Sequence, residues 1–229
     1  MKPRISHRWD VPVEEAMAIQ RRLASQVVLA WDERPVEMVA GIDVGFPGEK
    51  GRAAVAVLSF PDLQLVDSAR AEIEISFPYI PGLLAFREGP VILAALEHLS
   101  VEPDLLIFDG QGLAHPRRMG IATHMGVLLD MPSIGCAKSR LVGTHQEPGS
   151  RRGAYARLYD EGEVIGAVLR ARDGVNPVFV SIGHRIDLER AMDFVLRCCT
   201  RYRLPEPIRW AHQLASGERP PQGQQLSLF

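Results

Sequence analysis

The chain has 229 residues, a length that suits one globular domain with a full hydrophobic core. It is 46% hydrophobic and 24% charged with a net charge of −2, which excludes a disordered or strongly basic chain. No apolar run approaches the ~18 residues of a membrane span, and the first residues contain no apolar signal core. Three cysteines, two of them adjacent, exclude a disulfide framework. We therefore expect a cytoplasmic protein with no membrane partner.

The first part of the chain predicts one helix followed by a meander of strands. Apolar residues at helical spacing indicate a helix over 12–32, packed outside a sheet. Strands are expected at 39–44, 52–60 and 65–75. The turn signal Pro61-Asp62 between the last two makes this an antiparallel meander.

Helices and short strands follow the Pro-rich loop at 77–82. A long apolar helix candidate, interrupted by Gly89-Pro90, precedes strand–helix–strand units and two last helices. The predicted segments are 83–99, 104–108, 115–129, 133–137, 164–169, 178–182, 188–201 and 207–215. They describe an α/β fold with a mixed central sheet and helices on both faces, the layout of the ribonuclease H-like fold. We expect a single catalytic domain over 1–216 and a flexible tail over 217–229.

Three acidic residues each lie beside an apolar run. Asp43 is in the run 39–45, Asp109 closes the run 104–109, and Glu88 follows the Pro-rich loop. Burying an ionised carboxylate at a strand end is costly unless another group pairs with it. Hard oxygen ligands that converge on one sheet edge suit Mg²⁺ or Mn²⁺, the usual equipment for cutting or transferring phosphates. A single Asp at a strand end is more often a turn or cap residue.

Basic charge is almost entirely arginine, because only three lysines occur. Arginine side chains suit phosphate oxygens, although the same residues also suit a solvated surface. Local basic pairs occur at 117–118, 138 with 140, 151–152 and 201 with 203.

Seven short motifs, in one order along the chain, resemble the endonuclease V family. The likeness runs from about residue 12 to about residue 216. It departs at Gln111, where many members carry His, so a proton-shuttling role is not expected at this position. The motifs are Gly41–Phe46, Pro78–Gly82, Phe86–Glu88, Asp109–Arg118, Gly135–Lys138, Gly183–Arg185 and Tyr202–Pro207.

The resemblance implies a Mg²⁺-dependent DNA repair endonuclease, with Mn²⁺ as a substitute. Such an enzyme recognises deoxyinosine and cleaves the second phosphodiester bond 3′ to the lesion, leaving a 3′-hydroxyl and a 5′-phosphate. Asp43, Glu88 and Asp109 would hold the metal. His212 would be an outer ligand or orient water, and Lys138 would contact the scissile phosphate or position the water. Without the resemblance, His212 and Lys138 are also ordinary surface residues.

The loop Pro78-Tyr79-Ile80-Pro81 is stiffened by its two prolines. With the family likeness we expect it to wedge into a DNA duplex, although such a loop also fits a surface on which Tyr79 packs inward.

Glycines near the acids allow close backbone approach to a ligand. Main-chain groups could read the O6 and N1–H that distinguish hypoxanthine from adenine. Tight turns are the alternative use of these glycines, and His115 would either fix the 110–120 loop or simply begin a helix. The expected lesion pocket comprises Gly82, Leu84, Gly110, Gly112, Gly120, Ile121 and Gly135.

Two other functions stay open: a ribonuclease H-like nuclease acting on inosine-containing RNA, and a non-catalytic nucleic-acid-binding relative. The three acids argue against the second. The expected partner is DNA containing deoxyinosine, bound by a monomer.

The segment Gln225-Leu226-Ser227-Leu228-Phe229 is similar to the peptide by which bacterial polymerases and repair proteins dock on the β sliding clamp. Leu228 and Phe229 would fill an apolar pocket while Gln225 makes polar contacts. The alternative is that these apolar groups fold back onto the domain surface.

Overall fold

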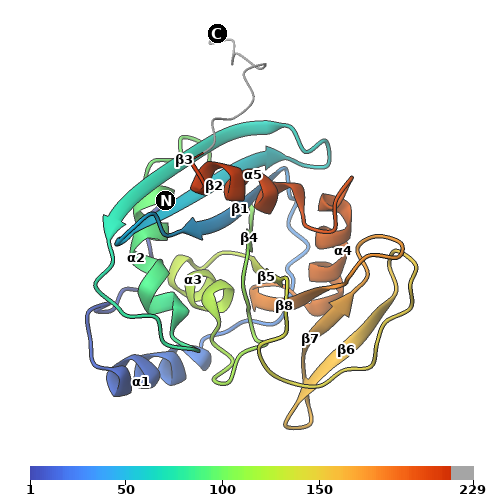
Figure 1. Cartoon of the computed structure of the whole chain (residues 1–229), viewed down its shortest axis with the longest axis horizontal. Coiled ribbons are helices and arrows are strands. Elements are labelled where there is room, and N and C mark those ends of the chain that lie inside the picture. The colour runs from blue at the N-terminus through green and yellow to red at the C-terminus, as the bar shows by residue number, and fades with distance from the viewer. Residues whose placement is uncertain (218–229) are drawn as a thin grey trace.

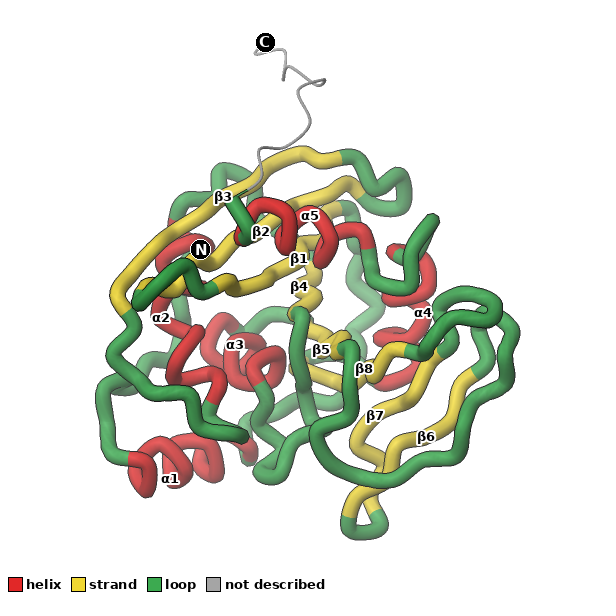
Figure 2. Tube along the Cα trace, in the orientation of Figure 1, coloured by secondary structure: helices red, strands yellow, loops and turns green. Residues whose placement is uncertain are grey.

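Within residues 1–217, which the computed structural model describes, the chain forms one mixed sheet of eight strands with helices on both faces (Figure 1). The strands lie in the order β3-β2-β1-β4-β5-β8-β7-β6. Figure 2 follows this sheet from β3 at the top to β6 at the lower right. The strands are β1 (Met38–Gly45), β2 (Lys50–Ser59), β3 (Leu65–Glu74), β4 (Leu105–Phe108), β5 (Ser133–Ala137), β6 (Tyr155–Asp160), β7 (Glu163–Leu169) and β8 (Val178–His184). The helices are α1 (Val13–Ala24), α2 (Leu84–Glu97), α3 (Ile121–Leu129), α4 (Leu188–Cys198) and α5 (Glu206–Ala215).

The strand directions confirm the predicted mixed sheet. β1, β2 and β3 form the antiparallel meander, whereas β4 runs parallel to β1 and β5 runs parallel to β4. β8 returns antiparallel to β5 and is followed in the sheet by β7 and β6. The three parallel strands therefore end at one edge, where the polar residues that follow them meet.

Side-chain alternation along the central strands separates two hydrophobic cores. Val39, Leu105 and Ile107 pack in one core with residues of α4 and α5. Ile42 and Phe108 pack in the other with residues of α2 and α3. The sheet is therefore buried on both faces, as its near-continuous apolar strands require.

Helix α5 approaches β1 more closely than any side chain on the strand would permit. A Cβ atom at Gly41 would lie 2.0 Å from the backbone carbon of Pro207 in the first turn of α5. Glycine at this position therefore sets the distance between α5 and the sheet, and with it the position of every side chain on α5.

The first helix is shorter than the sequence predicts: it ends at Ala24 and not at residue 32. Beyond it the backbone pairs with the end of β8, since Val28 O accepts from Arg185 N at 2.7 Å and Val28 N donates to His184 Nδ1 at 3.2 Å. These contacts hold the segment extended, which helical spacing could not reveal.

Two further helix predictions need correction. Helix α2 is continuous through Pro90; Trp9 packs against Gly89, and the flanking apolar residues are buried. Helix α3 begins at Ile121 and not near His115, because Arg118 adopts a left-handed conformation at φ 55° and interrupts the turn.

Strand β6 has no counterpart among the predicted segments. It lies at the edge of the sheet with Tyr155 and Tyr159 exposed, so it contains no apolar run to reveal it. Helix α4 also stops at Cys198, earlier than predicted. Across residues 1–217 none of the helices has the length and apolar character to cross a membrane.

Candidate active site

Asp43 and Asp109 leave the same edge of the sheet from neighbouring parallel strands. Ile42 pairs with Phe108 in the register of β1 and β4, and Asp109 N donates to Ile42 O at 3.1 Å. Each aspartate is the next residue along its strand direction, so the two carboxylates are neighbours. Glu88, from α2, joins them in the wall of one small cavity. The structure thus brings together the three acids that lie far apart in the sequence.

Each aspartate has a partner that carries or can accept a proton. His212 Nδ1 of α5 lies 2.7 Å from Asp43 Oδ2, and Lys138 Nζ, one residue beyond β5, lies 2.5 Å from Asp109 Oδ2. Both aspartates are mostly buried, whereas His212 is 61% and Lys138 42% exposed on the outer side. The partners therefore lie between the acids and the solvent, where a phosphate would approach.

Glu88 differs from the two aspartates because its carboxylate has no partner among the described residues. Its carboxylate has no hydrogen bond or ion pair within the described part of the chain, and burial raises its pKa to about 8, with further contributions from the charges of Asp43 and Asp109. Burial also raises the pKa of Asp43, more strongly than its hydrogen bond with His212 lowers it. A cation placed among the three carboxylates would offset both effects.

The donor set fits a hard divalent cation in its chemistry, since it consists of carboxylate oxygens. In residues 1–217, however, no group of three or more His, Cys, Asp or Glu side chains is already arranged as an ion site. Asp43 and Asp109 are instead directed at His212 and Lys138. Each of these contacts uses Oδ2, so a metal at this site would compete with His212 and Lys138 for the two carboxylates.

A second cavity, of about 310 Å³, opens beside the acids and shares Asp109 and Lys138 with them. Its volume is at the lower end of the range for small-molecule sites. Of the predicted lesion pocket, it is lined by Gly82, Leu84, Gly110, Gly120 and Ile121. The base-sized cavity and the acids are thus parts of one continuous site.

Gly112 and Gly135, two residues of the predicted lesion pocket, do not line this cavity; they lie in the backbone packing beneath it. A Cβ atom at Gly135 would lie 2.4 Å from the backbone nitrogen of Gly112, and one at Gly112 would lie 2.1 Å from Ile182 O. These glycines allow three backbone segments to pack directly on one another. Their nearness to the acids in the sequence therefore reflects chain packing beneath the site.

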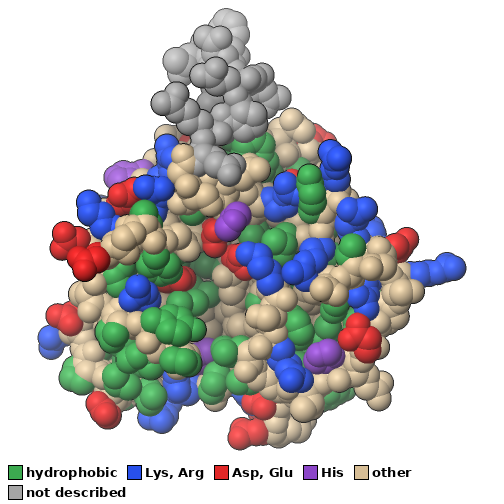
Figure 3. All heavy atoms as spheres, in the orientation of Figure 1, with side chains coloured by type: hydrophobic (Ala, Val, Ile, Leu, Met, Phe, Trp, Pro, Cys, Tyr) green, Lys and Arg blue, Asp and Glu red, His purple; other side chains and the backbone are tan. Residues whose placement is uncertain are grey.

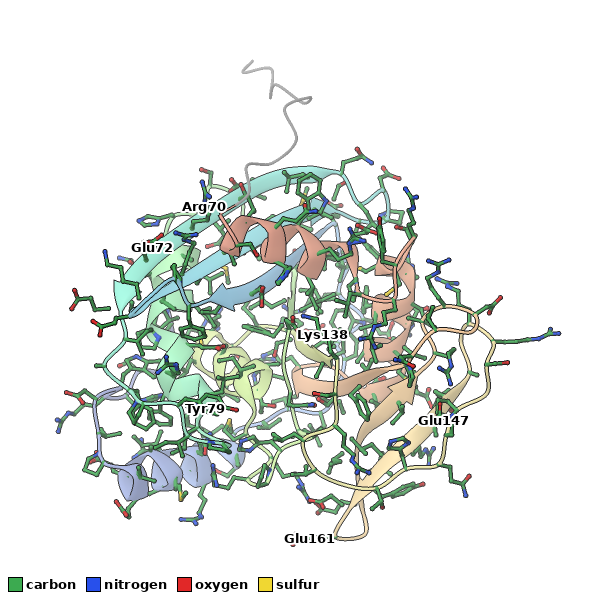
Figure 4. All side chains as sticks on the ribbon, viewed as in Figure 1. Arg70, Glu72, Tyr79, Lys138, Glu147 and Glu161 are labelled. Carbon is green, nitrogen blue, oxygen red and sulfur yellow. The ribbon has the colours of Figure 1, made fainter. Side chains whose placement is uncertain are left out.

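The loop expected to act as a wedge forms one rim of the cavity. Tyr79, Ile80 and Pro81 line it, whereas Pro78 does not. Tyr79, labelled in Figure 4, is 69% exposed, so its side chain does not pack inward. An exposed aromatic ring at the mouth of a base-sized cavity is well placed to meet a nucleic acid.

His115 ties the wedge loop to the loop after β4. Its Nε2 donates to Gly82 O at 2.9 Å while its Nδ1 accepts from Arg117 N at 3.1 Å. Burial lowers the pKa of His115 to about 4, and the charge of Arg117 adds to this effect. The ring is therefore neutral near pH 7 and positions the backbone of the cavity.

Gln20 is a wall residue that the sequence did not single out. It extends from α1, is almost fully buried, and donates from Nε2 to Gly82 O and Met119 O, both at 3.1 Å. Its Oε1 accepts from Arg117 Nε at 2.6 Å. The only signal for it was a polar residue on the apolar stripe of a helix.

Gln111, where the sequence departs from the family pattern, also lines the cavity. Its Nε2 donates to Ser139 O at 2.9 Å, which joins the loop after β4 to the segment after β5. Its Oε1 is buried and has no hydrogen-bond partner in the described chain. Other wall residues missing from the prediction are Ala85, Met119, Ala137, Ser139, Arg140 and Leu141. Residues 225–229, expected to bind a sliding clamp, lie outside the described residues.

Comparison with known proteins places this chain in a family. The family model described as Endonuclease V matches residues 21–213. Endonuclease V of Roseiflexus sp. (strain RS-1) is 55% identical over 213 residues, which cover 93% of this chain and 96% of that protein. The crystal structure of Endonuclease V from Streptomyces avermitilis superposes with a TM-score of 0.88 at 42% identity and covers 95% of this chain and 97% of its own.

A structure with bound nucleic acid is also similar to this chain. Ciona intestinalis Endonuclease V, solved in complex with a 24mer DNA containing an inosine followed by a ribo-adenosine, superposes with a TM-score of 0.77 at 27% identity. The match covers 90% of this chain and 96% of that one. Sequence and structure agree over nearly the whole length, and the chain belongs to the endonuclease V family of nucleases.

Proposed function

We propose that this protein is a Mg²⁺-dependent DNA repair endonuclease that recognises deoxyinosine and cleaves the second phosphodiester bond on its 3′ side. The observation that carries the proposal is the continuity of the 310 Å³ cavity with the three acids through Asp109 and Lys138. A base held in the cavity leaves its own backbone beside the carboxylates. The inosine-containing DNA bound by the Ciona relative supports the same substrate.

Recognition would fall to the cavity and its rim. Tyr79 would stack where the base has left the duplex, because its ring is exposed at the mouth of the cavity. The backbone at Gly82, Gly110 and Gly120 would read the edge of hypoxanthine, since glycine allows the base to approach main-chain N–H and C=O groups. Leu84 and Ile121 would supply apolar surface against the base.

Cleavage would fall to the acids and their partners. Asp43, Glu88 and Asp109 would hold Mg²⁺, or Mn²⁺ in its place. When bound, the metal would polarise the scissile phosphate and stabilise the leaving oxygen. Lys138 would move from Asp109 to the phosphate, and His212, released from Asp43, would orient the attacking water. Products with 3′-hydroxyl and 5′-phosphate ends are expected.

Matched oligonucleotides test this function. The protein and Mg²⁺ are incubated with DNA duplexes and DNA single strands carrying one inosine, with the same strands carrying adenine, and with an RNA strand carrying one inosine. Asp109→Asn is the inactive control. The cut is mapped against a ladder, and ligation detects the 5′-phosphate. We expect cleavage of inosine DNA only, one nucleotide beyond the lesion. Equal cleavage of adenine strands would refute the proposal, and preferential cutting of an inosine RNA would favour the RNA nuclease instead.

We also propose that the protein acts as a monomer. We further propose that 1–216 is the catalytic domain and that residues Gln225 to Phe229 bind a bacterial sliding clamp, as their similarity to clamp-docking peptides suggests. A peptide of 218–229 should bind purified clamp with a dissociation constant on the order of micromolar. Removing 225–229 should abolish clamp binding and leave cleavage of short oligonucleotides unchanged. Calorimetry that detects no binding by peptide or full chain would end this part of the proposal.

A further inference from the structure

A groove of about 450 Å³ lies on the other side of the acids from the base-sized cavity. We call it the α4–α5 groove. It is formed by the loop between α4 and α5, the loop between β7 and β8, and the outer side of α5. The residues used below are Arg172, Val175, Tyr202, Arg203, Leu204 and Arg209. His212 belongs to both the groove and the acid cluster, because it lines the groove and contacts Asp43.

The positions in the figures agree with this arrangement. Tyr79, at the rim of the cavity, lies to the lower left of Lys138 in Figure 4, whereas α5 lies above Lys138 and α4 to its right in the same view (Figure 1). On the same face, Figure 3 shows Lys and Arg side chains gathered between the areas of α5 and α4, beside a histidine. Cavity, acids and groove therefore follow one another across a single face of the molecule.

The groove carries positive charge that acidic residues of the described part of the chain leave largely unpaired. Within residues 1–217, neither Arg172 nor Arg203 has a carboxylate within 4.0 Å; they donate to the backbone oxygens of Arg201 and Pro177, respectively. Arg209 has only Glu206, at 3.8 Å. Guanidinium groups that are held by carbonyl oxygens and lack an acid are well suited to phosphate.

The groove also presents an aromatic ring in a fixed position. Tyr202 is 44% exposed, and the guanidinium carbon of Arg209 lies 3.2 Å from the centre of its ring. Arg209 therefore covers part of the ring and restrains it, while Val175 and Leu204 give the groove an apolar lining. A restrained aromatic ring beside unpaired arginines is the combination by which proteins hold single-stranded nucleic acid.

We propose that the α4–α5 groove binds the nucleotides immediately 3′ of the cleaved bond. Tyr202 stacks on a base of this segment, and Arg172 and Arg203 contact its phosphates. The direction of the strand rests on the proposed function: with inosine in the cavity and the scissile phosphate at the acids, the strand continues past His212 into the groove. The groove would thus hold the fragment that carries the new 5′-phosphate until release.

The test uses inosine single strands with one long 5′ flank and either one or six nucleotides beyond the cut. In the parent protein, shortening this 3′ flank should raise KM about tenfold, the scale of one stacked base. Tyr202→Ala should raise KM by a similar factor on the long substrate and leave the short one unchanged. Tyr202→Phe should behave as the parent. Tyr155→Ala, which removes another exposed tyrosine far along the sheet, is the matched control.

Two results would overturn the proposal. Equal effects of Tyr202→Ala on both substrates would make Tyr202 a structural residue, and an equal KM of the parent protein for both substrates would show that no nucleotide 3′ of the cut occupies the groove. A second arm needs no inosine. The affinity for single-stranded DNA is measured at several salt concentrations, and the slope of log affinity against log salt concentration is the salt slope. Arg172→Gln should reduce the magnitude of this slope by about 0.7, the value for one lost phosphate contact. If the parent protein cleaves no inosine strand, the proposed function is wrong, but the groove proposal is still tested by the salt slope. If Arg172→Gln leaves that slope unchanged, the groove does not bind the nucleic acid as proposed.

Discussion

His212 Nδ1 lies 2.7 Å from Asp43 Oδ2, although 169 positions separate the two residues in the chain. The contact exists because α5 packs directly on β1 at Gly41, where no side chain intervenes. One hydrogen bond thus depends on a backbone approach two residues earlier on the same strand. The geometry of the active site therefore depends on how α5 packs against β1.

Gly41→Ala should therefore reduce both stability and cleavage. The added Cβ would meet the backbone of Pro207 at 2.0 Å, so α5 must move outward at a cost of about 1–3 kcal/mol in unfolding free energy. Gly45→Ala is the graded control, because its Cβ would contact Ala215 O at 3.2 Å on the same strand and helix. Thermal unfolding and cleavage rates measure the effect. Equal behaviour of the two variants would show that the contact does not position α5.

Asp43→Asn and Asp109→Asn should each abolish cleavage and preserve binding to inosine DNA. The acids serve the chemistry, whereas the cavity and Tyr79 serve recognition. Anisotropy with labelled DNA measures binding, and gel analysis measures cleavage. Near-normal Mg²⁺-dependent turnover in either variant would refute the metal assignment.

Mn²⁺ or Mg²⁺ should raise the melting temperature of the parent protein at pH 7.5 without any substrate. The ion would offset the repulsion among the three carboxylates, and ligand binding to the folded state alone stabilises it. The shift should be much smaller in Asp109→Asn. A melting temperature that is insensitive to both ions up to millimolar concentrations would contradict the ligand set.

The metal-free protein should lose stability as pH rises. Burial raises the pKa of Glu88 from 4.5 to about 8, so the folded state binds the proton more tightly than the unfolded state. This contribution is fully present below about pH 4.5 and disappears as pH rises to about 8, a loss of at most about 5 kcal/mol. The raised pKa of Asp43 acts in the same direction. Denaturant unfolding in EDTA at pH 5.5 and at pH 8 measures this loss of unfolding free energy.

Glu88→Gln is the matched variant for this pH dependence, because it keeps the shape of the side chain and removes its proton. It should be less sensitive to pH than the parent over the same range. An equal loss of stability in both proteins would assign the effect to another group.

Tyr79→Ala should reduce discrimination between inosine and normal DNA more than it reduces general DNA affinity. Loss of one stacked base amounts to about 1–3 kcal/mol, or roughly one to two orders of magnitude in the ratio of kcat/KM values. Tyr159→Ala, at 42% exposure on the edge strand, is the control. Unchanged discrimination in Tyr79→Ala would end the wedge assignment.

The sequence alone was sufficient for most of the central sheet. β1, β4 and β5 are buried apolar runs, and their hydrophobicity is a local property that requires no knowledge of the fold. The edge strand β6 was missed for the same reason, since its exposed tyrosines give it no apolar run. Helix ends were the weakest point, because long-range contacts such as Val28 with Arg185 decide where α1 stops.

For the site, the sequence by itself determined the residue types, the three acids beside apolar runs and the family to which their motifs point. The tertiary structure alone decided which groups meet: Asp43 with His212, Gln20 with the cavity, and Gly112 with the backbone beneath it. It also placed Tyr202 and Arg209 together in the groove that His212 lines. The physical reason is that a local pattern reports what a side chain prefers. Its partners depend on backbone approaches, such as that of α5 to Gly41, between segments distant in the chain.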